Sequence, residues 1–369
     1  GNVFVGGGTS SSAATFPSTA FACAVRAGVD AFVIKLDATG NRVWTSVFCG
    51  ASGAFAESVR ALAVNTAGEV VVAGVTGSSD FPLQTPFDST LGGTRDAFVM
   101  KLTSDGTTQV WSSLLGGGTV ENSQGLDLDA GGDVYLCGDT TSAAGTGLET
   151  AGARDPDYGG GTDGFVAKIS AAGLRVWSSY IGGTGAAAAG TDGCNDLSVG
   201  GTEIYLGGVT GSADFELLNA FDGNNYEAGT DKEGFVMKLA ADGSLVWSSF
   251  LGGSKPVLPA VTDNEHVRGI AADPGGTFVV AAGTTKATDF PWTNGSGMDH
   301  TFGGSEDAVV ARITAAATTG LRVEALQSRW SGGKTETSWR LVDPANVEQM
   351  SIFVAGEGGA WERVGTPFE

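Results

Sequence analysis

The sequence predicts an all-β fold that is built from repeated four-stranded units, and three observations support this prediction. A run of the form DAFVMKLTSDGTTQVWSSLLGG occupies 96–117, and close copies occupy 30–50, 163–183 and 233–253. Glycine supplies 60 of the 369 residues and gathers at turns and strand ends, where tight backbone conformations are needed. Apolar residues make up 41% of the chain, which is enough to form a core. Together these features favour a single domain that is built from repeated structural units.

The copy at 96–117 has the pattern of a β-hairpin. Ala97 and Val99 alternate with Phe98, which gives the period of two that a strand requires. A turn containing Asp105 and a glycine follows, and a β-branched and aromatic strand then ends in a glycine pair. We therefore expect two paired strands in each copy.

Two further strand patterns recur with this hairpin. One ends in small residues and threonine, as in GEVVVAGVT at 68–76, and the other precedes it, as in RALAVNTAG at 60–68. The full unit thus has four short strands, named a, b, c and d in chain order, within about 66–74 residues. Four-stranded units of this length are typical of a β-propeller, in which blades are arranged radially.

These motifs resemble the bacterial beta-propeller repeat family, which is usually described as a seven-bladed-propeller repeat. The resemblance rests on G-[ND]-V-[YF]-[VL]-x-G-x-T, on DFP at 80–82 and 289–291, and on D-[AG]-F-V-x-K-[LI] followed by VWSS-x-[LI]-GG. It covers roughly residues 1–313. It implies a β-propeller in a secreted or surface protein of a bacterium, and it brings no common enzymatic activity.

Counting the copies predicts about five visible blades. A closed five-bladed ring and a larger ring both agree with this count. The first unit lacks strand a, so we expect the chain to be a processed or truncated segment. The predicted units lie at about 1–50, 57–117, 121–183, 194–253 and 265–313.

The remaining residues differ in character from the repeats. We expect a linker at 314–320 and, at 321–369, a partial β-sandwich-like segment. Alternation of apolar and polar residues at 336–343 and 350–356 resembles the opening strands of a fibronectin-type or immunoglobulin-like domain. Alternatively, the run GLRVEAL at 320–326 is a degenerate d strand of the fifth blade.

The chain is strongly acidic, with 20 basic and 41 acidic residues and a formal net charge of −21. Such a charge repels nucleic acid and anionic membranes, and it favours solubility, cations or basic partners. There is no run of 18 apolar residues, so we predict no membrane insertion. We expect an extracellular or outer-surface protein of a bacterium.

Antiparallel topology predicts that the two ends of each blade differ. One end carries the short a–b and c–d turns, and the other carries b–c loops of about 20 residues, where ligands commonly bind. Phe81 and Phe290 recur in register, so we interpret them as packing the loops onto the blades. Candidate ligand-binding residues among the other loop side chains are Tyr158, Tyr226, Trp292 and His300.

One loop has the composition of half a calcium-binding loop. The run DPDYGGGTD places Asp155, Asp157 and Asp163 around a glycine turn, although the bidentate glutamate of a full loop is missing. These residues are candidate Ca²⁺ ligands. The alternative for Asp163 is structural, because an acid recurs at the start of every c strand, where it would accept loop N–H groups: Asp30, Asp96, Asp163, Glu233 and Asp307.

Four cysteines map to the loop-bearing end of the predicted blades. Cys23 and Cys49 belong to one blade, whereas Cys137 and Cys194 belong to neighbouring blades. The pairs 23–49 and 137–194 are geometrically plausible and would suit an oxidising compartment. Free buried thiols are the alternative.

The sequence offers little for catalysis. Only two histidines are present, which argues against a His-type zinc site or a Ser-His-Asp triad. The d-strand tryptophans are interpreted as packing between blades: Trp44, Trp111, Trp177 and Trp247.

These observations favour a non-enzymatic binding, adhesion or scaffold module for a protein or polysaccharide. One alternative is a structural subunit of an extracellular assembly, which self-associates by strand complementation through 321–369. A second alternative is a glycan-active enzyme.

Overall fold

The computed structural model describes most of the chain. Residues 12–17, 22–27, 51–55, 185–190, 225–231, 254–264, 288–289, 291–306, 317–319, 332–333, 339–351, 356–360 and 365–369 are not described. The described residues form strands and turns, and none of them lies in an α-helix. No helix in this part of the chain could therefore cross a membrane. The all-β prediction is confirmed.

Five antiparallel sheets follow one another along the chain, and each is made from consecutive strands. The first blade contains β1 (Val3–Thr9), β2 (Asp30–Leu36) and β3 (Arg42–Phe48). The second contains β4 (Ser58–Val64), β5 (Val70–Thr76), β6 (Asp96–Leu102) and β7 (Gln109–Leu115). The third contains β8 (Glu121–Leu128), β9 (Val134–Thr140), β10 (Asp163–Ile169) and β11 (Arg175–Ile181).

The fourth blade contains β12 (Gly193–Gly200), β13 (Glu203–Thr210), β14 (Glu233–Ala240) and β15 (Leu245–Phe250). The fifth contains β16 (His266–Ala272), β17 (Phe278–Thr285), β18 (Asp307–Ala316), β19 (Gly320–Ser331) and β20 (Lys334–Ser338). A separate two-stranded sheet is formed by β21 (Ile352–Ala355) and β22 (Trp361–Val364).

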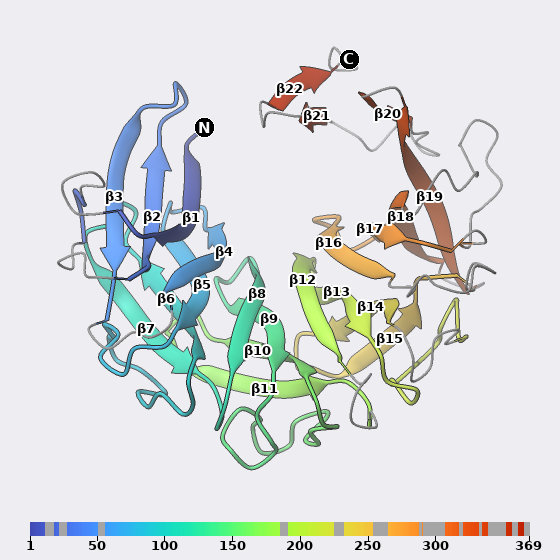
Figure 1. Cartoon of the computed structure of the whole chain (residues 1–369), viewed down its shortest axis with the longest axis horizontal. Helices are drawn as coiled ribbons and strands as arrows, with labels where there is room; N and C mark the ends of the chain where they lie inside the picture. Colours follow the sequence, from blue (N-terminus) through green and yellow to red (C-terminus); the bar gives the residue numbers. More distant parts are fainter. Residues whose placement is uncertain are drawn as a thin grey trace.

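The five blades are arranged around a common centre in the manner of a propeller (Figure 1). Strands β4, β8, β12 and β16 lie nearest the centre, and β3, β7, β11 and β15 lie outermost. The first and fifth blades lie at the two ends of an arc, so the described blades do not close into a ring (Figure 1). The prediction of a β-propeller built from four-stranded units is confirmed in its architecture.

The end of the fifth blade differs from the prediction. Of the expected linker at 314–320, residues 314–316 belong to β18 and residue 320 begins β19, and the two strands pair so that Ile313 faces Val323. Strand β20 then adds to the same sheet. Residues 320–331 and 334–338 therefore extend the fifth blade, which favours the alternative of a degenerate d strand at 320–326. The VWSS motif is absent from β19, but β19 still pairs with β18.

Hydrophobic cores lie between neighbouring blades. In β5, Val70 and Val72 belong to the core shared with the first blade. Val71 and Ala73 belong to the core shared with the third blade. Because successive side chains of a strand point to opposite faces, each central blade is buried on both sides. This explains why β5 has no exposed residue.

Trp44, Trp111 and Trp177 each connect their blade to the turn of the next by a hydrogen bond, whereas Trp247 contacts the fifth blade through the apolar core. Trp44 Nε1 donates to the carbonyl oxygen of Ser104 (3.2 Å), and Trp111 Nε1 donates in the same way to Ala171 (3.0 Å). Gly106 has a φ of 69°, and a Cβ there would lie 2.8 Å from the ring of Trp44. Packing between blades, as predicted for these tryptophans, is confirmed.

The serines of the VWSS motif attach each long loop to the outer strand of its own blade. Ser112 Oγ accepts the N–H of Gln84 (2.7 Å), and Ser113 Oγ accepts the N–H of Asp88 (2.9 Å). Ser179, Ser248 and Ser249 accept loop N–H groups in the same way in the third and fourth blades. Ser178 differs, because its hydroxyl donates to the carbonyl oxygen of Leu148 and its N–H donates to the hydroxyl of Thr150. The loops of the second, third and fourth blades therefore run back along the outer strands.

Candidate functional site

The loop end of the molecule, defined as the end that carries the b–c loops and the d–a connections, contains pairs of buried acids. In each pair, one acid lies at the start of a c strand and the other precedes or begins the a strand of the next blade. We call these the junction acid pairs. They are Asp30–Glu57, Asp96–Glu121 and Asp163–Asp192, and every member is at most 3% exposed.

One acid of each well-described pair is surrounded by hydrogen-bond donors. Glu121 accepts the Thr140 hydroxyl through Oε1 (2.7 Å) and the Gly117 N–H through Oε2 (3.0 Å). Asp192 accepts the Ser212 hydroxyl (2.6 Å) and the N–H of Gly183 (3.1 Å). Such donors stabilise an ionised carboxylate.

The other acid has fewer donors. Asp96 accepts the N–H of Gly92 through Oδ2 (3.0 Å), and Asp163 accepts the N–H of Gly159 through Oδ2 (2.7 Å). Oδ1 of each residue is buried and has no hydrogen-bond partner in the described part of the chain. These contacts agree with the structural alternative stated for the recurring acid, since both donors belong to the adjoining loop.

Glycine allows the two acids to approach each other. A Cβ on Gly116 would lie 2.6 Å from Asp96 Oδ2 and 2.8 Å from Glu121 Oε2. In the next junction, a Cβ on Gly182 would lie 2.8 Å from Asp192 Oδ2 and 3.4 Å from Asp163 Oδ1. The glycine pair that ends each d strand therefore has a specific role, because a side chain there would separate the carboxylates.

Burial and mutual repulsion make the junction acids hard to ionise. Burial raises the pKa of Asp96 to about 7, and the negative charge of Glu121 acts in the same direction. The pKa of Asp163 is likewise raised to about 7 by burial and by Asp192. Burial also raises the pKa of Glu57, with a contribution from Asp30.

Acids at the turn end, the opposite end of each blade, behave differently. Hydrogen bonds from the Thr103 hydroxyl and from the N–H and hydroxyl of Thr107 lower the pKa of Asp105 to about 2. The Thr39 hydroxyl and the Asn41 N–H lower the pKa of Asp37 to about 2. Both carboxylates are exposed and fully ionised at neutral pH.

The three predicted calcium ligands do not gather into one site. Asp155 accepts the N–H of Asp157 (3.1 Å), and Asp88 and Asp222 make the same contact two residues on in the neighbouring blades. Asp163 is buried at its junction, whereas Asp157 is exposed. Within the described residues, no group of three or more His, Cys, Asp or Glu side chains could hold a metal ion. The geometry gives the expected calcium site no support.

Tyr158 is half-buried in its loop. Its hydroxyl donates to the carbonyl oxygen of Gly161, and its ring lies 6.0 Å from that of Tyr180 against the core between the second and third blades. The other predicted ligand-binding residues, Tyr226, Trp292 and His300, lie outside the described residues. Their binding role stays a prediction.

The loop phenylalanines pack as expected. Phe81 is 5% exposed and lies 4.7 Å from Phe98 between ring centroids, and Phe290 is 2% exposed. The equivalent Phe215 makes the same contact with Phe235. These side chains hold the loops on the blades and are not available to a ligand.

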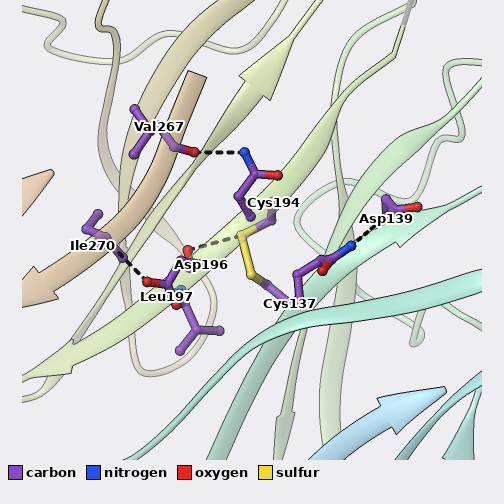
Figure 2. Close-up of a disulfide and its surroundings, with 9 residues drawn as sticks. Cys137, Asp139, Cys194, Asp196, Leu197, Val267 and Ile270 are labelled. Carbon is purple, nitrogen blue, oxygen red and sulfur yellow. Dashed lines mark hydrogen bonds between the residues drawn. A yellow bond between two sulfur atoms is a disulfide. The ribbon is translucent and has the colours of Figure 1, made fainter. Parts of the chain in front are cut away.

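A disulfide joins the third blade to the fourth (Figure 2). Cys137 on β9 and Cys194 on β12 are bonded, with a Cα–Cα distance of 5.8 Å and a sequence separation of 57. Cross-linking a loop of this length stabilises a fold by about 4 kcal/mol on chain-entropy grounds. The pairing is the one that topology predicted. Cys49 is also disulfide-bonded, and its predicted partner Cys23 lies outside the described residues.

Hydrogen bonds beside this disulfide extend the connection between blades to the fifth blade. Asp196 Oδ2 accepts the N–H of Ile270 (2.9 Å) (Figure 2). The adjacent Asn195 donates from its side-chain amide to the carbonyl oxygen of Val267. The inner strands β12 and β16 are therefore tied by polar groups as well as by the core.

Sequence reasoning missed the second member of each junction acid pair and its counterpart in the fifth blade, Glu265, which is also buried. Glu57, Glu121, Asp192 and Glu265 occupy equivalent places in the a-strand pattern, in the runs ESVR, ENSQ, DGCN and EHVR. Aligning these short runs would have shown a recurring acid. It would not have shown that the acid faces the c strand of the preceding blade, because that contact depends on how blades stack.

Comparison with known proteins gives no family assignment. No protein-family model matches the chain, and no curated protein matches it. Among solved structures, the chain is similar to an ACO/RPE65 chimera at 9% identity and a TM-score of 0.36, covering 90% of this chain and 61% of that one.

Two further solved structures are carbohydrate-active enzymes. A thermostable family-43 glycoside hydrolase matches at 9% identity and a TM-score of 0.33, covering 86% of this chain and 87% of that one. Rhamnogalacturonan lyase YesW matches at 11% identity and a TM-score of 0.32, covering 92% and 73%. Similarity this low carries no argument about function.

Proposed function

We propose that this chain is a non-enzymatic binding or scaffold module, secreted or held at the cell surface, that recognises a protein or polysaccharide through its loop end. The observation that carries the proposal is the fixed position of the loops. Residues 77–95 and 141–162 are fully described and are hydrogen-bonded to their outer strands. Loops ordered before binding lose less conformational entropy when a ligand arrives.

Contacts between loops add to this support. Arg154, in the loop of the third blade, forms an ion pair with Glu216 in the loop of the fourth blade, and it also donates to the carbonyl oxygen of Tyr180. Neighbouring loops thus form a continuous surface across two blades. The Cys137–Cys194 disulfide agrees with an oxidising, extracellular location.

The junction acid pairs do not favour a glycan-active enzyme. Glycoside hydrolysis uses two carboxyl groups that flank the scissile bond and must therefore contact the sugar. Asp96 and Glu121 are fully buried, and Asp163 and Asp192 are 1% and 0% exposed. A substrate cannot reach either pair.

A glycan array tests the proposal, with the variant Tyr226→Ala/Trp292→Ala compared with the wild type. We expect at least tenfold weaker binding, since stacking aromatic residues contribute strongly to recognition sites. The control is Leu174→Ala/Val176→Ala, which removes exposed apolar side chains at the turn end and should leave binding unchanged. Equal losses in both variants would contradict recognition at the loop end, and release of shortened glycans would favour the enzyme.

A second candidate, self-assembly by strand complementation, is favoured by the first blade. Val3 and Val5 of β1 are 53% and 41% exposed, whereas every residue of the equivalent strand β5 is buried. Within the described residues, β1 pairs only with β2, so its other edge can accept a strand.

Sedimentation velocity over a concentration series tests this candidate. We expect large species in the wild type that disappear in Val5→Lys, and in a chain ending at Ser338 that keeps the fifth blade but lacks β21 and β22. A monomer at every concentration in the wild type would contradict self-assembly.

A further inference from the structure

We propose that two of the junction acid pairs each hold a single proton, as a protonated aspartic acid beside an ionised partner, and that losing this proton loosens the contact between blades. The pairs in question are Asp96–Glu121 and Asp163–Asp192. These protonated acid pairs lie at the loop end, and their effect does not depend on ligand recognition. It makes the packing of the second, third and fourth blades responsive to pH.

The unequal supply of donors assigns the proton within each pair. Glu121 has a hydroxyl and an N–H donor, one on each oxygen, and Asp192 has a hydroxyl and several N–H donors. Asp96 and Asp163 each receive a loop N–H on Oδ2, and Oδ1 has no partner among the described residues. The acid with a bare oxygen is the one that gains most from carrying the proton.

The charges around each pair also require neutralisation. The charged groups that act on Asp96 are Glu121 and Asp88, and those that act on Asp163 are Asp192 and Asp155. Tyrosines are the other titratable neighbours: Tyr180 lies near Glu121 and Asp163, and Tyr158 lies near Asp163.

None of these neighbours is a base. Arg95 precedes Asp96 in the chain, but no cation is among the described groups that act on Asp96 or Asp163. Two buried carboxylates in such surroundings cannot both ionise without a large desolvation cost. The pair keeps its geometry when it holds one negative charge and one proton.

The groups that point at the pairs suit a proton better than a metal ion. Backbone N–H groups of Gly92, Gly117, Gly159 and Gly183 are directed at the carboxylates, and their positive ends would repel a cation. Among the described residues, no group of three or more acidic, His or Cys side chains forms the oxygen-rich coordination that Ca²⁺ requires. The close approach that Gly116 and Gly182 permit is the approach that a shared proton stabilises.

The sign of the effect follows from the raised pKa values. The pKa of Asp96 and of Asp163 is about 7 in the folded state, so both hold a proton between about pH 4 and pH 7, where the unfolded chain has lost it. Folding is therefore favoured at the acid end of this window. The contribution of each pair is lost as pH rises through 7.

Chemical unfolding between pH 4.5 and pH 8 is the test, with Asp96→Asn/Asp163→Asn beside the wild type. We expect the unfolding equilibrium constant of the wild type to rise by up to about tenfold per pH unit for each pair. Asparagine resembles the protonated acid in shape and cannot ionise, so the double variant should show a much weaker dependence. The control Asp105→Asn removes an exposed turn-end acid and should keep the wild-type dependence.

Infrared spectroscopy of the folded wild-type protein gives a second measurement, which does not depend on any variant folding. We expect the C=O stretch of a protonated carboxylic acid at pH 6, decreasing through pH 7 and reduced in the double variant. An absent band at pH 6, or an unchanged pH dependence in the double variant, would overturn the proposal. Calorimetric binding of Ca²⁺ that is lost in the double variant would also overturn it, in favour of a cation site.

Discussion

The two ends of a single hairpin place the same residue type in opposite electrostatic situations. Asp96 starts β6 at the loop end, where it is fully buried and its pKa is raised to about 7. Asp105 lies in the turn after β6, where hydroxyl and N–H donors surround it and its pKa is lowered to about 2. The difference teaches that a recurring aspartate has no fixed role in this repeat. Its surroundings decide whether it stabilises the fold as an anion or as a neutral acid.

These two ends therefore give opposite pH dependences. The turn-end acids contribute stability above the unfolded pKa near 4, and this contribution is lost as pH falls toward 2. The loop-end acids contribute below that value and lose their contribution as pH rises through 7. The turn-end contribution is complete above about pH 4 and the loop-end contribution falls progressively from there to pH 7, so we expect the greatest stability near pH 4.

The largest expected loss of stability comes from a substitution that disrupts packing at the turn end alone. Trp111→Ala removes a buried ring, which is 2% exposed, and its hydrogen bond to the turn of the third blade. We expect a loss of about 3–5 kcal/mol in the free energy of unfolding, measured by urea denaturation. Because the junction acids are untouched, the loss should be the same at pH 5 and pH 7. A loss that grows with pH would mean that the two ends are coupled.

A smaller loss of stability is expected from a substitution that disrupts packing at the loop end. Gly116→Ala places a methyl group between Asp96 and Glu121 and should cost about 1–3 kcal/mol through overpacking. The matched control is Gly223→Ala, where a Cβ would meet no atom within 4 Å. Differential scanning calorimetry should show a lower Tm for the first variant only. Equal Tm values for both would contradict close approach of the two acids.

The smallest expected change in stability tests the difference between the two ends at low pH. Asp105→Asn removes an exposed carboxylate whose depressed pKa favours the folded state. We expect a slightly lower Tm than that of the wild type at pH 6, because this small contribution is lost, and a weaker fall in Tm between pH 4 and pH 2 than in the wild type. Thermal unfolding followed by circular dichroism measures this difference. An unchanged fall would show that other acids control acid unfolding.

Much of the fold could be predicted from the sequence because the repeat displays local signals. Alternation in the DAFVMKL pattern, the turn glycines and the d-strand tryptophans each act within a few residues or on the neighbouring copy. Loop packing by Phe81 and the Cys137–Cys194 bond also followed, since topology alone brings those positions together.

The rest depends on surroundings that a linear pattern does not contain. The sequence around Asp155 resembles half of a calcium-binding loop. In the structure, Asp155 makes the same turn contact as its equivalents Asp88 and Asp222, which belong to loops without that calcium-like pattern. The partnership of Asp96 with Glu121 requires the stacking of two blades. The place of β19 in the fifth blade rests on strand pairing, because its sequence has lost the VWSS motif.

The serine pairs of the outer strands also help to cover part of the sheet edge of their blades. A sheet edge with free N–H and C=O groups can recruit strands from other molecules and seed fibrillar growth. In the second and fourth blades the outer strand instead bridges to its own loop, at Gln84 with Ser112 and at Leu218 with Ser248. Many copies of such a blade can therefore be crowded together, in tandem or on a surface, without joining edge to edge.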